Sequence, residues 1–229
     1  MDDVDNVRFP RRVRFLRNLA WLGLRLLTRL EIGSSQPFPR SGSALLVMNH
    51  LHWLDVVIGI AVVERPGVMF TAEKWEHRPV IGHVIRWSQR AIFVNRGEAD
   101  RKAITRALEV LRQGDMLAVA PEGTRSKTGA LIQGREGAAY LASRTGAIII
   151  PVAAYGQENA ERCWKRLRRP HIVVNMGEPF RLEGTPNKAK SQELGVYTEE
   201  SMLRLAALLP PEYRGVYREK LHQVQAEAV

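Results

Sequence analysis

The segment NHLHWLD, residues 49–55, brings together side chains that can do acid–base chemistry. It holds His50, His52 and Asp55 directly after the apolar run ALLVM. On one continuous helix His50 and Asp55 would lie on different faces, because they are five positions apart. If His50 lies in a turn before a helix and Asp55 in its first turn, the carboxylate can reach an imidazole nitrogen. The aspartate would then orient the ring so that Nε2 can take a proton from a hydroxyl.

Two other interpretations of this segment stay open from these residues alone. A zinc site would use His50, His52 and Asp55 as ligands, but the remaining histidines stand in no cluster of ligand types. A packing role would place His50 at a helix start, with its ring hydrogen-bonded inside the fold. The spacing H-x4-D is by itself a weak pattern, so other segments have to decide.

The segment PEGTRS, residues 121–126, is a second candidate because it directly follows the apolar run MLAVA. Its proline and Gly123 favour a tight turn with accessible backbone N–H groups. Those groups, together with Thr124 and Arg125, would suit an oxyanion or a phosphate. Glu122 in the same turn can accept hydrogen bonds from substrate hydroxyls. Taken alone, an ordinary turn with a solvated arginine is the simpler interpretation.

Short apolar runs alternate with helical patterns along the rest of the chain. Strands are expected at residues 44–48, 68–72, 91–94, 116–120, 147–152 and 171–176. Helices are expected at residues 54–64, 75–85, 98–114, 135–144 and 198–209. This alternation predicts an α/β fold, with a mostly parallel sheet flanked by helices. Ligands bind beyond the carboxyl ends of such strands, so His50, Arg96 and the 121–126 turn are expected on one rim.

Residues 11–30, RRVRFLRNLAWLGLRLLTRL, form an amphipathic pattern at helical spacing. Arginines occupy a polar arc of about 120°, apolar residues fill most of the remaining surface, and Trp21 lies within the basic arc. This pattern is typical of a helix in a membrane interface, and an ordinary helix packed on the domain is the alternative. The linker GSSQPFPRSGS then divides the chain into an N-terminal amphipathic membrane-interface helix, residues 1–36, and a main domain, residues 37–229.

The composition restricts the partners. The formal charge of +10, from 34 basic and 24 acidic residues, favours nucleic acid, anionic lipid or a phosphorylated substrate. Nucleic acid is disfavoured because the arginines cluster on a leucine-rich helix without aromatic stacking platforms. The single cysteine, Cys163, excludes an intrachain disulfide, and the acidic start MDDVDN is unlike a secretory signal. With no apolar run of about 18 residues, these features predict a peripheral or monotopic protein on the cytoplasmic face of the cell membrane.

Four segments together resemble a known family. NHLHWLD, RAIFVNR, APEGTRS and IIIPV occur in the order and at roughly the spacing of the four sequence blocks of glycerolipid acyltransferases. The resemblance is strongest to bacterial 1-acylglycerol-3-phosphate (lysophosphatidic acid) acyltransferases, and it extends over residues 40–180. Members of this family have a membrane-binding element of two N-terminal helices, which the arginine-rich helix fits, although one helix is evident here.

The resemblance implies a role for each candidate residue. His50 would be the general base and Asp55 its partner. A larger set would bind the substrates, namely Lys74, Arg96, Glu122, Gly123, Thr124, Arg125 and Pro151. Of these, Arg96 and the residues of the turn would bind the phosphorylated glycerol acceptor. Pro151 would lie near the acyl donor, and Lys74 in TAEKWE is similar to a lysine often found in the family.

The implied reaction moves a fatty acyl group from acyl-ACP (acyl carrier protein) or acyl-CoA to a lysophospholipid, without a metal or bound cofactor. The acceptor that fits the resemblance best is 1-acylglycerol-3-phosphate, which would give phosphatidic acid. The alternatives are a same-fold acyltransferase for another lysolipid, such as lyso-ornithine lipid, and a non-catalytic protein that binds anionic lipid. Two departures concern the acceptor: Arg90 replaces a usual glycine, and Ala120 a usual phenylalanine. Arg90 would add charge at the phosphate or alter the acceptor.

Overall fold

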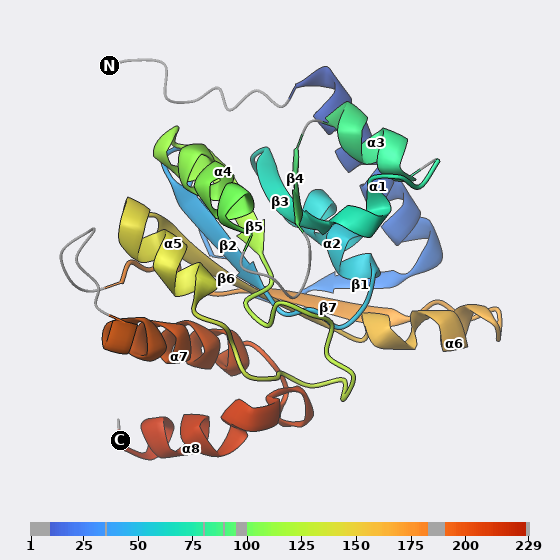
Figure 1. The fold of residues 1–229 in the computed structure, drawn as a ribbon. Helices are drawn as coiled ribbons and strands as arrows, with labels where there is room; N and C mark the ends of the chain where they lie inside the picture. Colours follow the sequence, from blue (N-terminus) through green and yellow to red (C-terminus); the bar gives the residue numbers. More distant parts are fainter. Residues whose placement is uncertain are drawn as a thin grey trace.

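Figure 1 shows the chain as a computed structural model, in which one sheet is covered by helices on both faces. The structure describes residues 10–34, 36–79, 81–88, 90–94, 100–182 and 191–227. Within these ranges the sheet has seven strands in the order β1-β7-β6-β2-β5-β3-β4. The strands are β1 (Arg29–Ile32), β2 (Ala44–Met48), β3 (Gly67–Ala72), β4 (Ala91–Val94), β5 (Met116–Val119), β6 (Ile148–Tyr155) and β7 (His171–Met176).

The sheet is mostly parallel, which confirms the predicted fold class. Strands β2 to β6 run in one direction, β7 is antiparallel to β6, and β1 is parallel to β7. Every residue of β2 is buried, as expected for a central strand covered on both faces. The carboxyl ends of β2 to β6 therefore meet at one edge, which we call the carboxyl edge.

Two layers of helices bury the two faces of the sheet (Figure 1). On one face lie α1 (Arg11–Leu27), α2 (Leu54–Val62) and α6 (Ala160–Trp164), and α3 (Ile81–Ser88) lies beside α1. On the other lie α4 (Arg101–Arg112), α5 (Gly137–Thr145), α7 (Ser191–Ala207) and α8 (Arg218–Glu227). Alternate residues of β2 enter the two cores, since successive side chains of a strand point to opposite faces. None of the described helices is long and apolar enough to span a bilayer.

The predicted N-terminal helix is wrong in its last residues. It ends at Leu27, and Arg29–Ile32 form β1, which pairs with β7 at the edge of the sheet. Pairing with β7 satisfies the backbone of these residues, and that tertiary contact overrides their helical propensity. Leu24 is buried in the core under α2. The N-terminal segment is therefore packed into the same fold as the rest of the chain.

The remaining elements differ from the prediction mainly at their ends. The helix expected at 98–114 spans Arg101–Arg112 and begins where the carboxylate of Asp100 accepts a hydrogen bond from the N–H of Ala103. The helix expected at 198–209 begins earlier and spans Ser191–Ala207. The short helix α6 and the C-terminal helix α8 were not predicted, because neither carries a long apolar period.

Candidate active site

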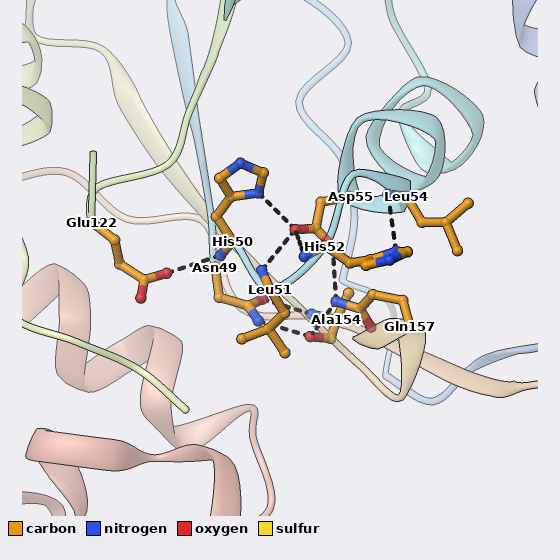
Figure 2. A network of polar contacts seen from close by, with 9 residues as sticks. All are labelled: Asn49, His50, Leu51, His52, Leu54, Asp55, Glu122, Ala154 and Gln157. Atoms are coloured by element: carbon orange, nitrogen blue, oxygen red, sulfur yellow. Dashed lines mark hydrogen bonds and ion pairs between the residues drawn. The ribbon is translucent and has the colours of Figure 1, made fainter. Parts of the chain in front are cut away.

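The side chains of His50 and Asp55 touch, as expected if His50 lies in a turn and Asp55 in the first turn of the following helix (Figure 2). Nδ1 of His50 lies 2.7 Å from Oδ2 of Asp55. His50 follows β2 at the carboxyl edge, and Asp55 lies in the first turn of α2. Because an ionised carboxylate only accepts hydrogen bonds, Nδ1 is the donor in this pair, and in a neutral ring Nε2 is the nitrogen that can accept a proton. Figure 2 shows this second ring nitrogen pointing away from Asp55, free to face a substrate.

The backbone before α2 wraps around the Asp55 carboxylate. Oδ2 also accepts hydrogen bonds from the N–H groups of Leu51, at 2.7 Å, and His52, at 2.8 Å. The positive end of the α2 dipole adds to the stabilisation of the negative charge. The side chains of His50 and Asp55 are only 13% and 5% exposed, so these interactions are screened little by water. The spacing of five between His50 and Asp55 thus leaves enough residues for the backbone to fold around the Asp55 carboxylate at the start of α2.

The other oxygen of Asp55 is held by Gln157, 102 residues away in the sequence. Gln157 begins the short helix η2 (Gln157–Asn159) after β6, and its Nε2 donates to Asp55 Oδ1 at 2.9 Å and to the carbonyl of Ala154 at 3.1 Å. Its side chain is buried, and its Oε1 accepts no hydrogen bond from the described part of the chain. Gln157 was not among the site residues predicted from the sequence. The available signal was its place just after a strand expected to end at the same edge.

Asn49 fixes the point where the loop leaves the sheet. Its side-chain amide donates to the carbonyl of Ala154 and accepts from the N–H of Ala154, both at 2.8 Å. The last backbone pair between β2 and β6 is Met48 with Val152. The buried Asn49 side chain therefore extends this pairing beyond the strand end, while the main chain turns away to present His50.

The turn of residues 121–126 is attached to the peptide of His50 on both sides. The N–H of His50 donates to Oε1 of Glu122 at 2.9 Å, and the N–H of Ser126 donates to the carbonyl of His50 at 2.8 Å. The second carboxylate oxygen of Glu122 accepts from the N–H of Ile132 at 3.1 Å. The two segments that were predicted to share a rim therefore lie together, and the turn helps to position His50.

Glu122 holds the backbone of the 49–55 loop in place. The sequence had instead suggested that it accepts hydrogen bonds from substrate hydroxyls. Its side chain is 1% exposed, and both carboxylate oxygens accept backbone N–H groups. Burial raises the pKa of Glu122 above its ordinary value, and the bonds from the N–H groups of His50 and Ile132 oppose that rise. A direct hydrogen bond to a substrate hydroxyl would need an exposed carboxylate. The geometry therefore favours a positioning role for Glu122.

Gly123 and Thr124 form the exposed part of the turn, and Arg125 is half-buried beside them. Gly123 has a φ of 70°, in the left-handed region that favours glycine. A Cβ at this position would lie 2.9 Å from Cδ of Arg135, so close packing also requires glycine here. Arg135 therefore adds a second guanidinium beside the turn. Arg135 was not predicted as a site residue, because its place in the sequence indicated only the start of a helix.

The comparison with known families decides the class of protein. The family model for Acyltransferase matches residues 29–155, more than half of the 229 residues. The chain belongs to the acyltransferase family. The matched part of this acyltransferase runs from β1 to the end of β6 and includes His50, Asp55 and the 121–126 turn. Gln157 lies just beyond the match.

Two curated relatives of this acyltransferase are each named 1-acyl-sn-glycerol-3-phosphate acyltransferase. The protein from Borreliella burgdorferi is 27% identical over 133 residues, which cover 57% of this chain and 53% of that protein. The protein from Bacillus subtilis is 20% identical over 196 residues, which cover 85% of this chain and 96% of that protein. The match therefore spans about half of the length of the first relative and nearly all of the second.

A solved structure has the same fold as this acyltransferase. It is the crystal structure of the 1-acyl-sn-glycerophosphate (LPA) acyltransferase PlsC from Thermotoga maritima. The superposition has a TM-score of 0.66 with 20% sequence identity, and covers 93% of this chain and 80% of that chain. At this identity the likeness establishes the arrangement of helices and strands.

Two of the other predicted substrate-binding residues, Lys74 and Pro151, lie in or directly after strands of the same sheet. Lys74 is exposed in the short helix η1 (Glu73–Trp75), directly after β3. Since β5 alone separates β3 from β2, Lys74 follows a strand about 10 Å from the one that carries His50. Pro151 is buried inside β6, paired with Val47 and below the level of His50. Arg96 lies outside the described residues.

Arg90 lies away from the site, which contradicts the first of its two expected roles, added charge at the phosphate. It precedes β4 and forms an ion pair with Asp115, with Nη1 and Oδ2 3.7 Å apart. Asp115 precedes β5. Both residues therefore lie at the amino ends of parallel strands, on the edge opposite to His50. Ala120 is half-buried, and its carbonyl accepts the N–H of Gly123 within the turn.

His52 turns away from the pair of His50 and Asp55. Its Nε2 lies 3.7 Å from Oε1 of Glu161 in α6, and its ring contacts Trp53 at a centroid distance of 5.5 Å. In the portion of the chain that the structure describes, no group of three His, Cys, Asp or Glu side chains is arranged to hold a metal ion. His50, His52 and Asp55 therefore do not form the zinc ligand set considered from the sequence.

Proposed function

We propose that this acyltransferase moves a fatty acyl group from acyl carrier protein or coenzyme A to the free hydroxyl of 1-acylglycerol-3-phosphate, giving phosphatidic acid. The observation that carries the proposal is the 2.7 Å contact of His50 with Asp55, next to a turn that bears Arg125. The names of the relatives from Borreliella burgdorferi and Bacillus subtilis support the same acceptor.

His50 serves as the general base of this reaction. Its Nε2 takes the proton of the acceptor hydroxyl while that oxygen attacks the carbonyl carbon of the thioester. The tetrahedral intermediate then collapses: the C–S bond breaks, the C–O bond of the ester remains, and the imidazolium gives its proton to the leaving thiolate. Asp55 stabilises the imidazolium between the two steps, and Gln157 keeps the Asp55 carboxylate in position.

The exposed turn binds the phosphate of the acceptor. The hydroxyl of Thr124 and the guanidinium groups of Arg125 and Arg135 supply charge-assisted donors. The turn is bonded to the His50 peptide, so a phosphate held there brings a nearby hydroxyl to the base, and proximity supplies part of the acceleration. Lys74 and Arg96 remain predicted contributors of positive charge at the carboxyl edge.

One side of α1 supports docking to a membrane. Phe15, Leu19, Leu22 and Leu26 are each 54 to 64% exposed, and their spacing places them in one line along the helix. We call these four residues the apolar stripe. The opposite side of α1 packs on the domain through Leu24. A helix with a packing role alone would not carry an apolar stripe in water, whereas a bilayer interface would cover it.

The apolar surface continues onto α3. Val84 and Trp87 are exposed there, and the rings of Phe15 and Trp87 meet edge to face with centroids 6.4 Å apart. An apolar surface with arginines on the same helix suits an anionic leaflet. Because the cytoplasmic leaflet is anionic, we propose that the protein docks on the cytoplasmic face of the cell membrane. A lipid acceptor would then reach the carboxyl edge without leaving the bilayer.

A turnover assay with matched acceptors tests this function. The purified protein receives acyl-ACP or acyl-CoA, and thiol release is measured with lysophosphatidic acid, monoacylglycerol or lyso-ornithine lipid. We expect turnover of lysophosphatidic acid with at least one donor. Monoacylglycerol, which lacks the phosphate, should have a kcat/KM about 100-fold lower, because the charge-assisted hydrogen bonds to the phosphate are lost.

The variant Arg125→Gln is the matched control for the phosphate contact. It should lower kcat/KM for lysophosphatidic acid about tenfold and so reduce the preference over monoacylglycerol. Equal use of both acceptors by the wild type would reject the phosphate assignment. Selective use of lyso-ornithine lipid would identify another acceptor, and no thiol release with any acceptor would favour a non-catalytic lipid-binding protein.

A further inference from the structure

The connection from α6 to β7 carries a dense positive charge that the proposed reaction does not use. Residues 162–169, RCWKRLRR, hold five basic side chains, and we call this segment the basic loop. It leaves the sheet at the carboxyl edge, after β6, and returns at the start of β7. Arg162 bonds to Asn159, whereas Lys165, Arg166 and Arg168 are exposed.

We propose that the basic loop is a second docking site for an anionic phospholipid bilayer, separate from the apolar stripe of α1. The proposal rests on the proposed function in one respect, because it assumes an acceptor that resides in the bilayer. The binding surface itself follows from the shape, charge and attachment of the loop.

Leu167 gives the loop an apolar tip. Its side chain is 98% exposed, and it is the one non-glycine residue in the described ranges with a positive φ, 54°. A left-handed backbone is costly for leucine and does not improve packing here, since the side chain touches little else. The N–H groups of Leu167 and Arg168 are bonded to the carbonyls of Trp164 and Cys163, so the turn that presents the leucine is fixed.

The charges around this tip fit a phospholipid surface. Arg166 and Arg168 flank Leu167 directly. In a bilayer interface the leucine would enter the acyl boundary while the two guanidinium groups remain at the level of the phosphates. A single apolar side chain between two cations offers too little area for a protein interface, whereas it suits the gradient from headgroup to acyl chain.

The basic loop is held against the C-terminal end of α1. Nε1 of Trp164 donates to the carbonyl of Leu27 at 2.9 Å, and Arg169 donates to the carbonyls of Arg25 and Thr28. These contacts use the free carbonyls at the helix end, where cations are favoured. The basic loop thus lies at the end of α1 that carries Leu26, the last residue of the apolar stripe, and in this proposal one bilayer contacts both.

A small recess bounded by α1, β1 and Arg169 of the basic loop adds a place for a headgroup. It has a volume of about 320 Å³, and its lining includes Arg25, Arg29 and Arg169. Three guanidinium groups around a recess favour a phosphate group. Leu30 and Ile32 also line it, which suits a phosphate that carries an apolar chain.

The basic loop is also linked to the catalytic residues. The ring of Trp164 contacts the ring of Trp53 at a centroid distance of 6.3 Å, and Trp53 lies between His50 and Asp55 in the sequence. Docking of the loop would therefore fix the height of the carboxyl edge above the bilayer. Lysolipid would be delivered to His50 from the same leaflet that the loop binds.

Vesicle cosedimentation tests the proposal. The variant Arg166→Gln/Arg168→Gln should bind vesicles of phosphatidylglycerol and phosphatidylcholine on the order of tenfold more weakly than wild type, since each basic residue contributes to binding an anionic leaflet. The control Arg112→Gln/Arg218→Gln removes the same charge from exposed positions on α4 and α8, away from α6 in Figure 1. It should bind as wild type does. If both double variants weakened vesicle binding equally, the loss would depend on net charge and not on the basic loop, and the proposal would be overturned.

A second measurement does not depend on loss of binding. The variant Cys163→Ser/Leu167→Cys carries a single cysteine at the tip, because the chain has one native cysteine. A polarity-sensitive dye at this position should shift to shorter wavelength with phosphatidylglycerol vesicles and stay unchanged with pure phosphatidylcholine. An unchanged spectrum with anionic vesicles would show that the tip stays in water and would overturn the proposal.

Turnover with a short-chain, monomeric acceptor separates this inference from the proposed function. With acyl-CoA as donor, Arg166→Gln/Arg168→Gln should turn over this acceptor as wild type does. If the KM for acyl-ACP rises while vesicle binding is unchanged, the basic loop binds the acidic carrier protein and not the bilayer. If wild type shows no turnover at all, the proposed function fails, whereas the vesicle and dye results still decide the role of the basic loop.

Discussion

The loop of residues 49–55 and the basic loop of residues 162–169 meet through Trp53 and Trp164, yet they are built in opposite ways. The first holds the proposed catalytic pair, and we call it the catalytic loop. It is largely buried, with Trp53 as its exposed residue, and Asp55 alone accepts four hydrogen bonds. The second exposes its cations and its apolar tip and is attached through its ends. Proton transfer requires groups fixed in position, whereas binding a bilayer requires exposed cations that reach the phosphates and an exposed apolar side chain that enters the acyl boundary.

This contrast makes the two regions separable by experiment. Changes in the catalytic loop and its supports should lower kcat with every acceptor, whether monomeric or embedded in vesicles. Changes in the apolar stripe or the basic loop should affect only the use of vesicle-bound acceptor. A basic-loop or stripe variant that lowered kcat with a monomeric acceptor would show that the two regions are coupled more tightly than their contacts indicate.

The largest effect is expected from Asp55→Asn. The amide cannot accept all three hydrogen bonds of Oδ2 with the same geometry, and it leaves the imidazolium of His50 without a counter-charge. We expect kcat to fall about 10³- to 10⁴-fold with a small change in KM. Steady-state kinetics with monomeric and vesicle-bound acceptor check this, and both should fall equally. A variant that keeps a tenth of the wild-type kcat would contradict the role of Asp55.

The next largest effect concerns the apolar stripe. Leu22→Asn/Leu26→Asn should weaken vesicle binding on the order of 100-fold, since each leucine would contribute about 1.5 kcal/mol or more when buried in the interface. The kcat with a monomeric acceptor should stay at the wild-type level. The control Val196→Asn/Val216→Asn changes exposed apolar residues of α7 and the segment before α8. If cosedimentation responds equally to both pairs, the stripe is not the docking surface.

A smaller effect on kcat is expected from Gln157→Met. The change removes the donor to Oδ1 of Asp55 while keeping the buried volume, and kcat should fall about tenfold at constant KM. In an Asp55→Ala background the same substitution should have no further effect, because Gln157 acts through Asp55. Additive losses in this double-mutant cycle, or a large drop in melting temperature, would assign Gln157 to packing alone.

The smallest effect is a pH dependence of stability at Glu122. Because burial raises its pKa, the folded state holds this proton more tightly than the unfolded state. Stability therefore falls as the pH rises from the ordinary value of 4.5 through the raised native value. Glutamine does not titrate in this range. The free energy of unfolding of wild type minus that of Glu122→Gln, which we call the margin, should therefore become smaller as the pH rises. Urea unfolding at several pH values measures the margin, and a margin that widened would contradict the assignment.

Local patterns predicted much of the fold. The apolar runs identified β2 to β7 because buried strands in a parallel sheet are continuous in hydrophobicity. Strand β1 was missed, since RLEI follows an amphipathic helix and its pairing with β7 depends on residues about 140 positions away. The reversed direction of β7 was also invisible, because strand direction is a property of the connection and not of the strand residues.

The candidate site was predictable where its contacts are local. His50 and Asp55 are close in sequence, and the strand–loop–helix pattern was enough to bring them together. Gln157 and Arg135 were missed because long-range packing brings them to the site. Glu122 was identified as important, but burial cannot be read from a polar turn.

The most direct test of the central claim is the turnover of His50→Ala with a monomeric short-chain lysophosphatidic acid, measured beside wild type. General-base catalysis contributes about 10²- to 10⁴-fold, so kcat should fall at least 100-fold, while KM, vesicle binding and the circular dichroism spectrum stay at wild-type values. Turnover near the wild-type rate by a correctly folded His50→Ala protein would contradict the account.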